Sequence, residues 1–245
     1  MTPEWMGRTA RRSGVVAALL AIALSLAALD AEPARARDAR APLGSVLRIY
    51  LARHGQTDWN AAHRLQGSID THLNAQGREQ AAALAKRLAG IRFDAVYSST
   101  LSRTRETAAI VHGRVPIDSL PGLNERRMGR FQGVVRDSDS TLAAEFDRRL
   151  NTPGDDLDGG ETREQHFARV SAALDRIRRQ HPAGTVLVVG HGGTNQMLLK
   201  ALLGLTWDQT TAINQGNDEL YMIEIEPGVP PRLWKWVGES NLKDL

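Results

Sequence analysis

Residues 46–55 read VLRIYLARHG, an apolar run that ends in Arg53-His54-Gly55. A second apolar run, VLVVG at residues 186–190, is followed by His191-Gly192. Short runs of β-branched and aliphatic residues that end near glycine are typical of buried strands. Because ligands bind at the carboxyl ends of parallel strands, the two histidines are predicted to meet in one pocket. Two imidazoles beside a guanidinium favour an anionic substrate, and phosphate above all.

Strand and helix patterns alternate along the chain and predict an α/β domain. Asn74 is expected to cap a helix closed by Gly90, and Gly204 is expected to end another. Thr162 and Gln165 form a capping box for a long helix. The expected strands are 46–52, 95–98, 115–117, 185–190, 220–225 and 233–237, and the expected helices are 74–90, 102–111, 139–150, 162–180 and 194–203. The last two strands are expected at a sheet edge.

Three further motifs lie between the two histidine motifs. In order, the set reads LARHGQTDWN at 51–60, STLSRTRET at 99–107, LNERRMG at 123–129, GGET at 159–162 and VGHGG at 189–193. This set resembles the signatures of the histidine phosphatase (phosphoglycerate mutase-like) superfamily, over roughly residues 46–225. The resemblance implies a three-layer α/β/α sandwich with a mostly parallel central sheet and a small helical insertion. Residues 118–160 are the expected insertion.

His54 is the predicted nucleophile. Neutral imidazole is a good nucleophile near pH 7, and its attack on phosphorus would give a phosphohistidine. The resemblance places the superfamily's phosphorylated histidine at this position. Gly55 is expected to leave room for the backbone to pass close to the bound phosphate.

Arg53, Arg103 and His191 are predicted to clamp the phosphate. Phosphoryl transfer develops charge on the equatorial oxygens, and fixed donors aimed at them lower the barrier. His191 is expected to donate to a phosphate oxygen, best when it is protonated. The resemblance adds Asn60 as a further donor, and Gly192 is expected beside the phosphate. A surface ion pair for Arg103 is the structural alternative.

Glu125 is the candidate general acid and base, since the superfamily places this group at the glutamate of its Leu-x-Glu motif. Asp58 and Glu161 are rival carboxylates, and Glu161 is the better candidate for a supporting role. Arg126 and Arg127 are expected either to bind a second anionic group of the substrate, such as a carboxylate, or to form a solvated charged turn.

Three functions remain open at this stage. A phosphomonoester hydrolase is favoured over a mutase because only 66 positions separate Glu125 from His191, which leaves out the longer insertion of cofactor-dependent mutases. The motif LNERRMGRFQG at 123–133 favours a mutase. A non-catalytic relative that only binds phospholigands is the third reading, and the complete residue set disfavours it. His191-Gly192 disfavours the acid-phosphatase branch, which carries His-Asp there.

Composition excludes several classes of function. The 245-residue chain has no cysteine, so disulfides, thiolate nucleophiles and thiolate metal sites are excluded. Residues 1–45 hold six arginines and four acidic residues, which leaves 25 basic and 24 acidic residues for the rest. This near balance predicts no nucleic-acid partner. No metal-ligand spacing is visible, so neither a metal nor a cofactor is expected, and the expected partner is a small phosphomonoester. Nothing in the sequence assigns an oligomeric state.

The N-terminus carries a different pattern. Arg8, Arg11 and Arg12 precede an uncharged run from Val15 to Leu29, and Ala34-Arg35-Ala36 follows. This layout is typical of a secretory signal, although an uncleaved membrane anchor fits as well.

Residues 1–42 are therefore interpreted as a signal peptide or membrane anchor with a linker, and residues 43–245 as the histidine phosphatase domain. The protein is expected to be exported, periplasmic or secreted, or membrane-anchored. A start codon assigned too early is the alternative, and it would make the protein cytoplasmic.

Overall fold

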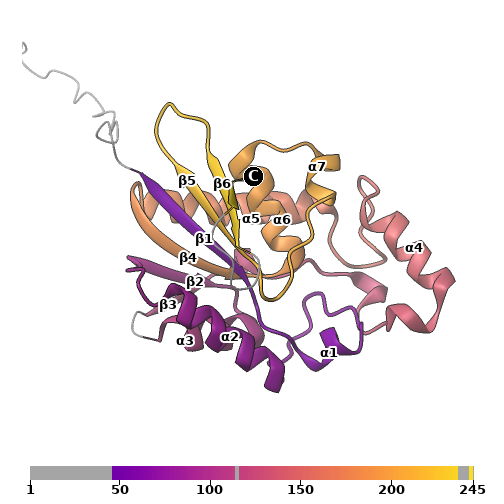
Figure 1. Cartoon of the computed structure of the whole chain (residues 1–245). Helices are drawn as coiled ribbons and strands as arrows, with labels where there is room; N and C mark the ends of the chain where they lie inside the picture. Colours follow the sequence, from indigo (N-terminus) through magenta and orange to yellow (C-terminus); the bar gives the residue numbers. More distant parts are fainter. Residues whose placement is uncertain (1–45, 114–115, 237–242, 245) are drawn as a thin grey trace, which may run out of the picture. The chain divides into compact units, whose positions relative to one another are not determined.

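The computed structural model describes residues 46–113, 116–236 and 243–244, so the predicted signal or anchor lies outside the described residues. Seven strands form one sheet in the order β3-β2-β4-β1-β5-β6-β7 (Figure 1). The strands are β1 (Leu47–Arg53), β2 (Ala95–Ser98), β3 (Ile117–Ser119), β4 (Gly184–Gly190), β5 (Leu220–Ile225), β6 (Arg232–Trp236) and β7 (Lys243–Asp244). Within the described ranges, no helix has the length and apolarity needed to cross a membrane.

The two histidine motifs lie on neighbouring strands. β1 and β4 pair in parallel, with Arg53 opposite Gly190. The backbone N–H of His54 continues the pairing by donating to the carbonyl of Gly190 at 3.0 Å. His54 and His191 therefore leave the sheet side by side at its carboxyl edge, where this class of fold binds ligands.

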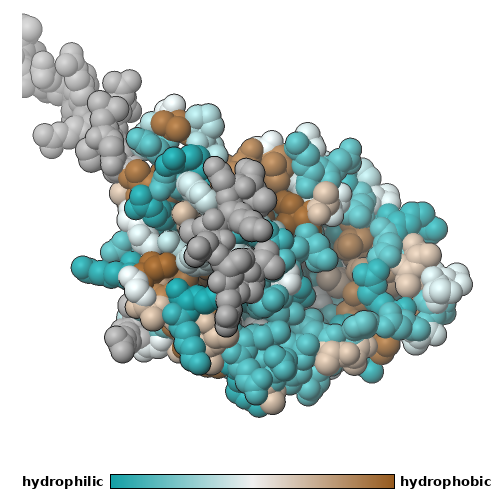
Figure 2. All heavy atoms as spheres, in the orientation of Figure 1, coloured by the Kyte–Doolittle hydropathy of each residue, from teal (hydrophilic) through white to brown (hydrophobic). Residues whose placement is uncertain are grey.

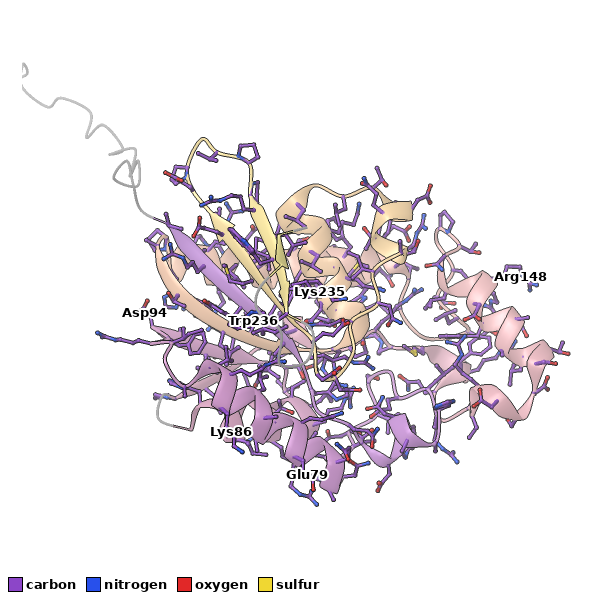
Figure 3. The ribbon with its side chains drawn as sticks, viewed as in Figure 1. Glu79, Lys86, Asp94, Arg148, Lys235 and Trp236 are labelled. Atoms are coloured by element: carbon purple, nitrogen blue, oxygen red, sulfur yellow. The ribbon has the colours of Figure 1, made fainter. Side chains whose placement is uncertain are left out.

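The second half of the sheet is antiparallel. β3, β2, β4 and β1 run parallel, whereas β5, β6 and β7 are each antiparallel to the preceding neighbour in the sheet. On β6, Lys235 pairs with Glu219 at 2.9 Å, and the Trp236 ring lies 6.4 Å from that of Tyr50 (Figure 3). The late strands lie toward one end of the sheet, but β7 forms the edge there and β5 is paired on both sides, so the expectation that β5 and β6 are edge strands is corrected.

Helices cover both faces of the sheet and complete three layers (Figure 1). The helices α2 (Ala75–Leu88) and α3 (Ser102–His112) pack on one apolar cluster, and α5 (Arg163–Gln180) and α6 (Gly192–Leu203) pack on the other. The outward face of α2 is hydrophilic (Figure 2). The predicted three-layer α/β/α fold is confirmed, because alternate residues of β1 and β4 enter opposite clusters.

The predicted helix signals act as expected. The Asn74 side chain accepts from the N–H of Gly77, and Thr162 with Gln165 forms the reciprocal capping box of α5. Gly204 ends α6 with φ 67°, a left-handed conformation that suits glycine.

The expected helical insertion lies between β3 and β4, beyond the end of β1 (Figure 1). It contains the 3₁₀ turns η1 (Pro121–Leu123), η2 (Gly129–Phe131) and η3 (Arg136–Ser138), and the helix α4 (Ser140–Leu150). Phe131, Phe146 and Leu157 form its own small core, and Arg149 pairs with Asp155 and Asp158 around it.

Several elements differ from the prediction. β3 begins at Ile117 rather than at residue 115, which lies outside the described residues. The short helices α1 (Asp58–Ala61) and α7 (Trp207–Thr211) were not predicted. Each begins at a threonine capping box, but neither is long enough to show helical periodicity.

Candidate active site

The ring of His54 is buried at the end of β1 and has a defined tautomer. Its Nδ1 lies 2.8 Å from the carbonyl oxygen of Gly55, so Nδ1 carries the proton and Nε2 keeps a free lone pair. Burial lowers the pKa of His54 well below its usual value, and the charges of Arg103 and Arg53 lower it further. The free protein thus presents a neutral imidazole, the reactive form of a histidine nucleophile.

Arg53 offers an unsatisfied donor beside this ring. Its Nη1 donates to the carbonyl of Gln215 at 2.7 Å, which fixes the guanidinium. Its Nε is buried and has no hydrogen-bond partner within the described residues. Since a buried N–H without a partner is costly, this atom is suited to an incoming anion. Arg53 thus fits its predicted role in binding phosphate.

Arg103 and His191 lie together but are bonded to each other. The His191 ring lies 5.2 Å from the His54 ring, centre to centre. Arg103 Nε donates to His191 Nδ1 at 3.2 Å, and its Nη atoms donate to the carbonyls of Gly67 and Ile69. Arg103 is therefore not in the surface ion pair considered as the alternative.

His191 differs in detail from the expectation. Its Nε2 lies 2.8 Å from Ser99 Oγ while its Nδ1 accepts from Arg103, so both ring nitrogens are engaged in the free protein. Burial and the Arg103 charge lower the pKa of His191 well below its usual value. His191 is thus neutral here, whereas donation by the protonated ring was expected. Burial beside the charges of Arg103 and Arg53 disfavours a further positive charge on this ring.

Glu125 sits at the N-terminus of α6. Its oxygens accept from the N–H groups of Gly193 at 3.0 Å, Thr194 at 3.1 Å and Arg126 at 2.9 Å. A Cβ at Gly193 would lie 2.8 Å from a carboxyl oxygen, so glycine makes this approach possible. The carboxyl group is thereby fixed at the first turn of α6, directly after the second histidine motif.

Glu161 acts on the segment that carries Glu125 through Arg169. It forms a bidentate ion pair with Arg169. The Nε and Nη2 atoms of Arg169 donate to the two carboxyl oxygens of Glu161 at 3.0 and 2.7 Å. The Nη1 of Arg169 in turn donates to the carbonyls of Gly122 and Asn124, next to Glu125. Glu161 therefore positions the segment that carries Glu125, the supporting role expected for it. Asp58, the other rival, is exposed in α1.

Arg126 has backbone partners that the sequence did not indicate. Its guanidinium is buried and donates to the carbonyls of Glu161 at 2.7 Å, Leu150 at 2.7 Å and Asp155 at 3.1 Å. It therefore ties the loop 151–160 to the end of α4, and these carbonyls occupy donors that a substrate anion would need, so the role of Arg126 in binding substrate stays a prediction. The local sequence could not show this, because the accepting carbonyls lie 24 to 35 positions away.

Replacing Arg126 by methionine is expected to lower the free energy of unfolding by about 3 kcal/mol, because buried carbonyls lose their charged donor. Urea unfolding measures the change. The neighbouring Arg127 is exposed, with one long contact to Gly160, so Arg127→Met is the matched control and should stay within about 0.5 kcal/mol. Equal effects of the two substitutions would contradict the assignment.

The reason for Gly55 also differs from the prediction. A Cβ at Gly55 would lie 2.3 Å from the carbonyl oxygen of Gly77 on α2. Glycine is needed here for close packing of the catalytic loop on a helix, not for the passage of backbone past phosphate. Gly192 borders the Arg53 guanidinium, since a Cβ there would lie 3.6 Å from its Cζ.

The side chain of Asn60 takes part in the N-terminal capping of α1. Its side-chain oxygen accepts from the N–H of Thr57 at 3.2 Å as part of the capping box of α1. Its amide nitrogen makes no hydrogen bond within the described part of the chain, so a donor remains for an anion. Thr57 also bonds Gln66, which links α1 to the loop that Arg103 holds.

The sequence analysis missed the polar residues that orient the site. Asn195 Nδ2 donates to Gln215 and to the carbonyl of Ala52, and Gln215 Nε2 donates to the carbonyl of Leu51. This pair fixes the end of β1 and presents the carbonyl that holds Arg53. Neither residue belongs to a motif, and only their burial in the folded chain identifies them.

A third buried histidine, His166, lies behind Glu125. Its Nε2 is 3.1 Å from Thr194 Oγ1 and 3.9 Å from a Glu125 oxygen. Burial, together with the charges of Arg169 and Arg126, lowers the pKa of His166 well below its usual value. His54, His166 and His191 are thus all neutral in the folded protein.

These three histidines predict acid sensitivity. Below about pH 6.5 the unfolded chain protonates them and the folded chain does not, so stability is present above that pH and is lost below it. Each should contribute a loss of about 2 kcal/mol between pH 6.5 and pH 5. Urea unfolding of His166→Gln should show a shallower pH dependence, whereas the exposed His63→Gln should match the parent. An unchanged slope in His166→Gln would refute this.

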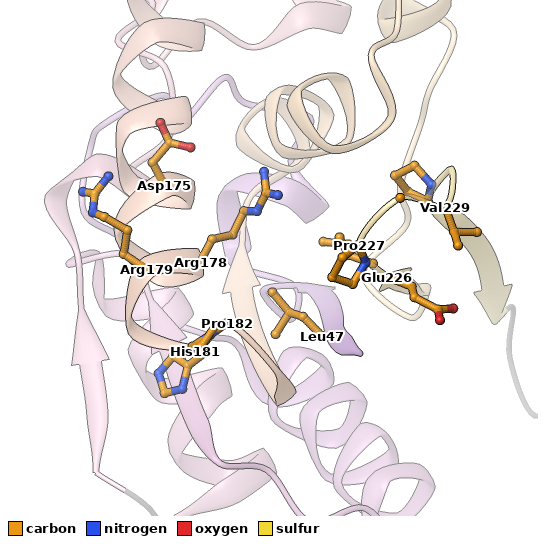
Figure 4. A pocket seen from close by; sticks show the side chains of 12 residues that line it. Leu47, Asp175, Arg178, Arg179, His181, Pro182, Glu226, Pro227 and Val229 are labelled. Atoms are coloured by element: carbon orange, nitrogen blue, oxygen red, sulfur yellow. The ribbon is translucent and has the colours of Figure 1, made fainter. Parts of the chain in front are cut away.

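One cavity lies at the opposite end of β1 from this chemistry. A cavity of about 580 Å³ lies at the start of β1, where Arg178 and His181 of the α5 end face Pro227 and Val229 (Figure 4). A smaller cavity of about 230 Å³ opens directly beside Glu125 and Gly193. In the described part of the chain, no group of three or more histidine and carboxylate side chains could hold a metal ion.

Comparison with known proteins gives a consistent result. The profile of the histidine phosphatase superfamily (branch 1) matches residues 49–236. Phosphoglycerate mutase-like protein 4 of Arabidopsis thaliana is 36% identical over 157 residues, covering 61% of this chain and 68% of that protein. Metal-independent phosphoserine phosphatase of Arabidopsis thaliana is 38% identical over 155 residues, covering 60% of this chain and 65% of that protein. This chain thus aligns with about two thirds of each.

A solved structure extends the likeness. The mycobacterial glucosyl-3-phosphoglycerate phosphatase matches with a TM-score of 0.70 at 26% identity, covering 79% of this chain and 100% of that one.

Proposed function

The chain belongs to branch 1 of the histidine phosphatase superfamily, and from this we propose that it hydrolyses small phosphomonoesters through a phosphohistidine on His54. The observation that carries the proposal is the geometry of His54, a neutral ring with Nδ1 held by Gly55 and Nε2 free. The buried unpaired donor on Arg53 supports it, since it suits an anion beside that nitrogen.

In the first step, His54 Nε2 attacks phosphorus and the bond from phosphorus to the leaving oxygen breaks. Arg53, Arg103 and His191 stabilise the charge on the equatorial oxygens, and Glu125 gives a proton to the leaving oxygen. In the second step, water attacks phosphorus, the phosphorus–nitrogen bond breaks, and Glu125 takes the proton of the water. The products are the free alcohol and inorganic phosphate.

Binding of the phosphate would require His191 to change partner. The ring bonds Arg103 and Ser99, and its centre lies 5.2 Å from that of the His54 ring. An anion between the two rings would favour the protonated form of His191, because an opposite charge offsets the cost of burial. Arg103 and His191 would therefore act as phosphate donors only after the bond between them is exchanged for bonds to the anion.

The test is a time course of phosphate release from a panel of phosphomonoesters, with a chelator present throughout. Release without metal supports the proposal, and silence on every substrate would reject it. Relatives include a phosphoserine phosphatase and a glucosyl-3-phosphoglycerate phosphatase, so phosphoserine and phosphorylated glycerates belong in the panel.

Mutase activity is the second candidate, favoured by the likeness to a phosphoglycerate mutase-like protein. It is tested in the same panel with 3-phosphoglycerate, with and without 2,3-bisphosphoglycerate. Formation of 2-phosphoglycerate with little free phosphate would replace hydrolysis by phosphate transfer.

We also propose that the protein is exported to the periplasm or medium, or anchored at a membrane. Within residues 1–42, arginines precede an apolar run and small residues follow it, as in a secretory signal. N-terminal sequencing of the protein from its native host is expected to begin after the apolar run. A protein that begins at Met1 and pellets with membranes would indicate the anchor, and one that begins near Leu43 in the cytoplasm would indicate a misassigned start.

A further inference from the structure

The cavity of about 230 Å³ beside Glu125 is placed to receive the leaving group. Glu125 and Gly193 form its inner wall, and Glu125 is the proposed proton donor to the leaving oxygen. Pockets that bind drug-sized ligands usually have volumes of about 300–1,000 Å³, so this cavity is small by comparison. The space is therefore suited to a compact leaving group and not to a large one.

The rest of the wall is mixed, with six apolar residues beside seven polar or charged ones. Its apolar members come from the loop after α1, the insertion, α6 and α7, and they are Leu65, Met128, Phe146, Leu150, Met197 and Trp207. Ligand sites of this kind stabilise an apolar group by removing its surface from water, and the few polar groups orient it. Phe146 and Trp207 also supply ring surfaces for a flat group.

The cations that line this cavity already have partners. Arg126 donates to three backbone carbonyls. Arg136 bonds both carboxyl oxygens of Asp147 at 2.6 Å. Arg163 bonds Glu164 at 2.7 Å, and its guanidinium lies 4.4 Å from the centre of the Trp207 ring.

The inner wall adds no positive charge. His166 lines the cavity next to Glu125, and burial keeps it neutral. A carboxylate on the leaving group would thus face the carboxyl group of Glu125 and would have to displace an existing ion pair or carbonyl contact. Desolvating a carboxylate that gains no free cationic partner disfavours its binding.

We propose that this cavity selects phosphomonoesters with a compact, mainly apolar leaving group over those whose leaving group carries a carboxylate. The proposal deepens the phosphatase function and rests on it. It sets the expected substrates of this chain apart from phosphoserine and the phosphoglycerates. The uncharged alcohol product would leave from a wall that gives it no ionic contact.

The test compares benzyl phosphate with phosphoserine and 3-phosphoglycerate, which all release a primary alkoxide and so place similar demands on the acid. The value of kcat/KM for benzyl phosphate is expected to be at least about tenfold higher than for either carboxylate substrate, the scale of discrimination that an apolar pocket gives. An equal or higher value for a carboxylate substrate overturns the proposal. No hydrolysis of any of the three would reject the phosphatase function itself and the selectivity with it.

Two variants test whether the cavity causes this difference in kcat/KM. Leu65→Lys and Thr211→Lys each add an unpaired cation to the wall, at a half-buried and an exposed position. Each should narrow the ratio of kcat/KM between benzyl phosphate and phosphoserine by about tenfold. Ile110→Lys adds the same charge on the exposed face of α3 and should leave the ratio unchanged. An unchanged ratio in both cavity variants, or the same narrowing in Ile110→Lys, overturns the proposal.

Discussion

Replacing His54 by alanine is expected to lower kcat by at least about 10⁴-fold on every phosphomonoester, because the substitution removes the atom that forms the covalent intermediate. The fold should survive, since the backbone N–H of His54 keeps its bond to Gly190. The ring nitrogen that is lost bonds only the adjacent carbonyl of Gly55. Stopped-flow measurement of phosphate release, at saturating substrate, gives the change in kcat.

Acid-quenched mass spectrometry separates the nucleophile from a supporting histidine. The parent protein should carry one phosphoryl group on His54 after brief exposure to a phosphodonor, and His54→Ala should carry none. His63→Ala is the matched control, because His63 is exposed and has no proposed part in the reaction. A label on His191 in the parent would move the nucleophile to the second motif. A protein with phosphate affinity but no label would be a binder and not an enzyme.

The sequence predicted the catalytic strands because their signals are local. Apolar runs ahead of His54 and His191 identify buried strands, and the parallel register of β1 with β4 then brings the two rings to one edge. The capping residues Asn74 and Thr162 worked for the same reason, since a cap needs only the three residues that follow it. Most of the fold could therefore be predicted from residues at the ends of strands and helices.

The remainder depends on contacts between distant segments. Arg126 was expected to meet an anion, yet the fold supplies carbonyls from the 151–160 loop and the end of α4 before any ligand arrives. Gly55 was assigned to the phosphate, but its neighbour is Gly77 of α2. A charged or small residue has the same appearance in the sequence in either role, and only the packing partner decides between them.

His166 is a residue near the site that the sequence did not identify. It lies in no recognised motif, and a single histidine on a helix is usually part of the packing. The contact with Thr194 and the distance of 3.9 Å to Glu125 make it part of the wall that faces the leaving group. The selectivity proposed for the cavity therefore depends on residues that no motif names.

Replacing Glu125 by glutamine is expected to separate the two chemical steps. With alkyl phosphates such as benzyl phosphate, kcat should fall by about 10²–10⁴-fold, because the leaving alkoxide loses its proton donor. With 4-nitrophenyl phosphate the leaving phenolate needs little protonation, so the first step should be nearly normal. The second step needs Glu125 as a base in both cases, so phosphohistidine should accumulate.

The expected signature is a burst of nitrophenol equal to the enzyme concentration, followed by slow turnover and a phosphorylated His54. Glu161→Gln is the matched control, because Glu161 acts only by holding Arg169 and the segment before Glu125. A positioning defect of that kind should slow both substrates by similar factors and give no burst. If Glu125→Gln also slows both substrates alike, then its four hydrogen bonds with the α6 N-terminus and its own segment are its whole role, and the proton donor is another group.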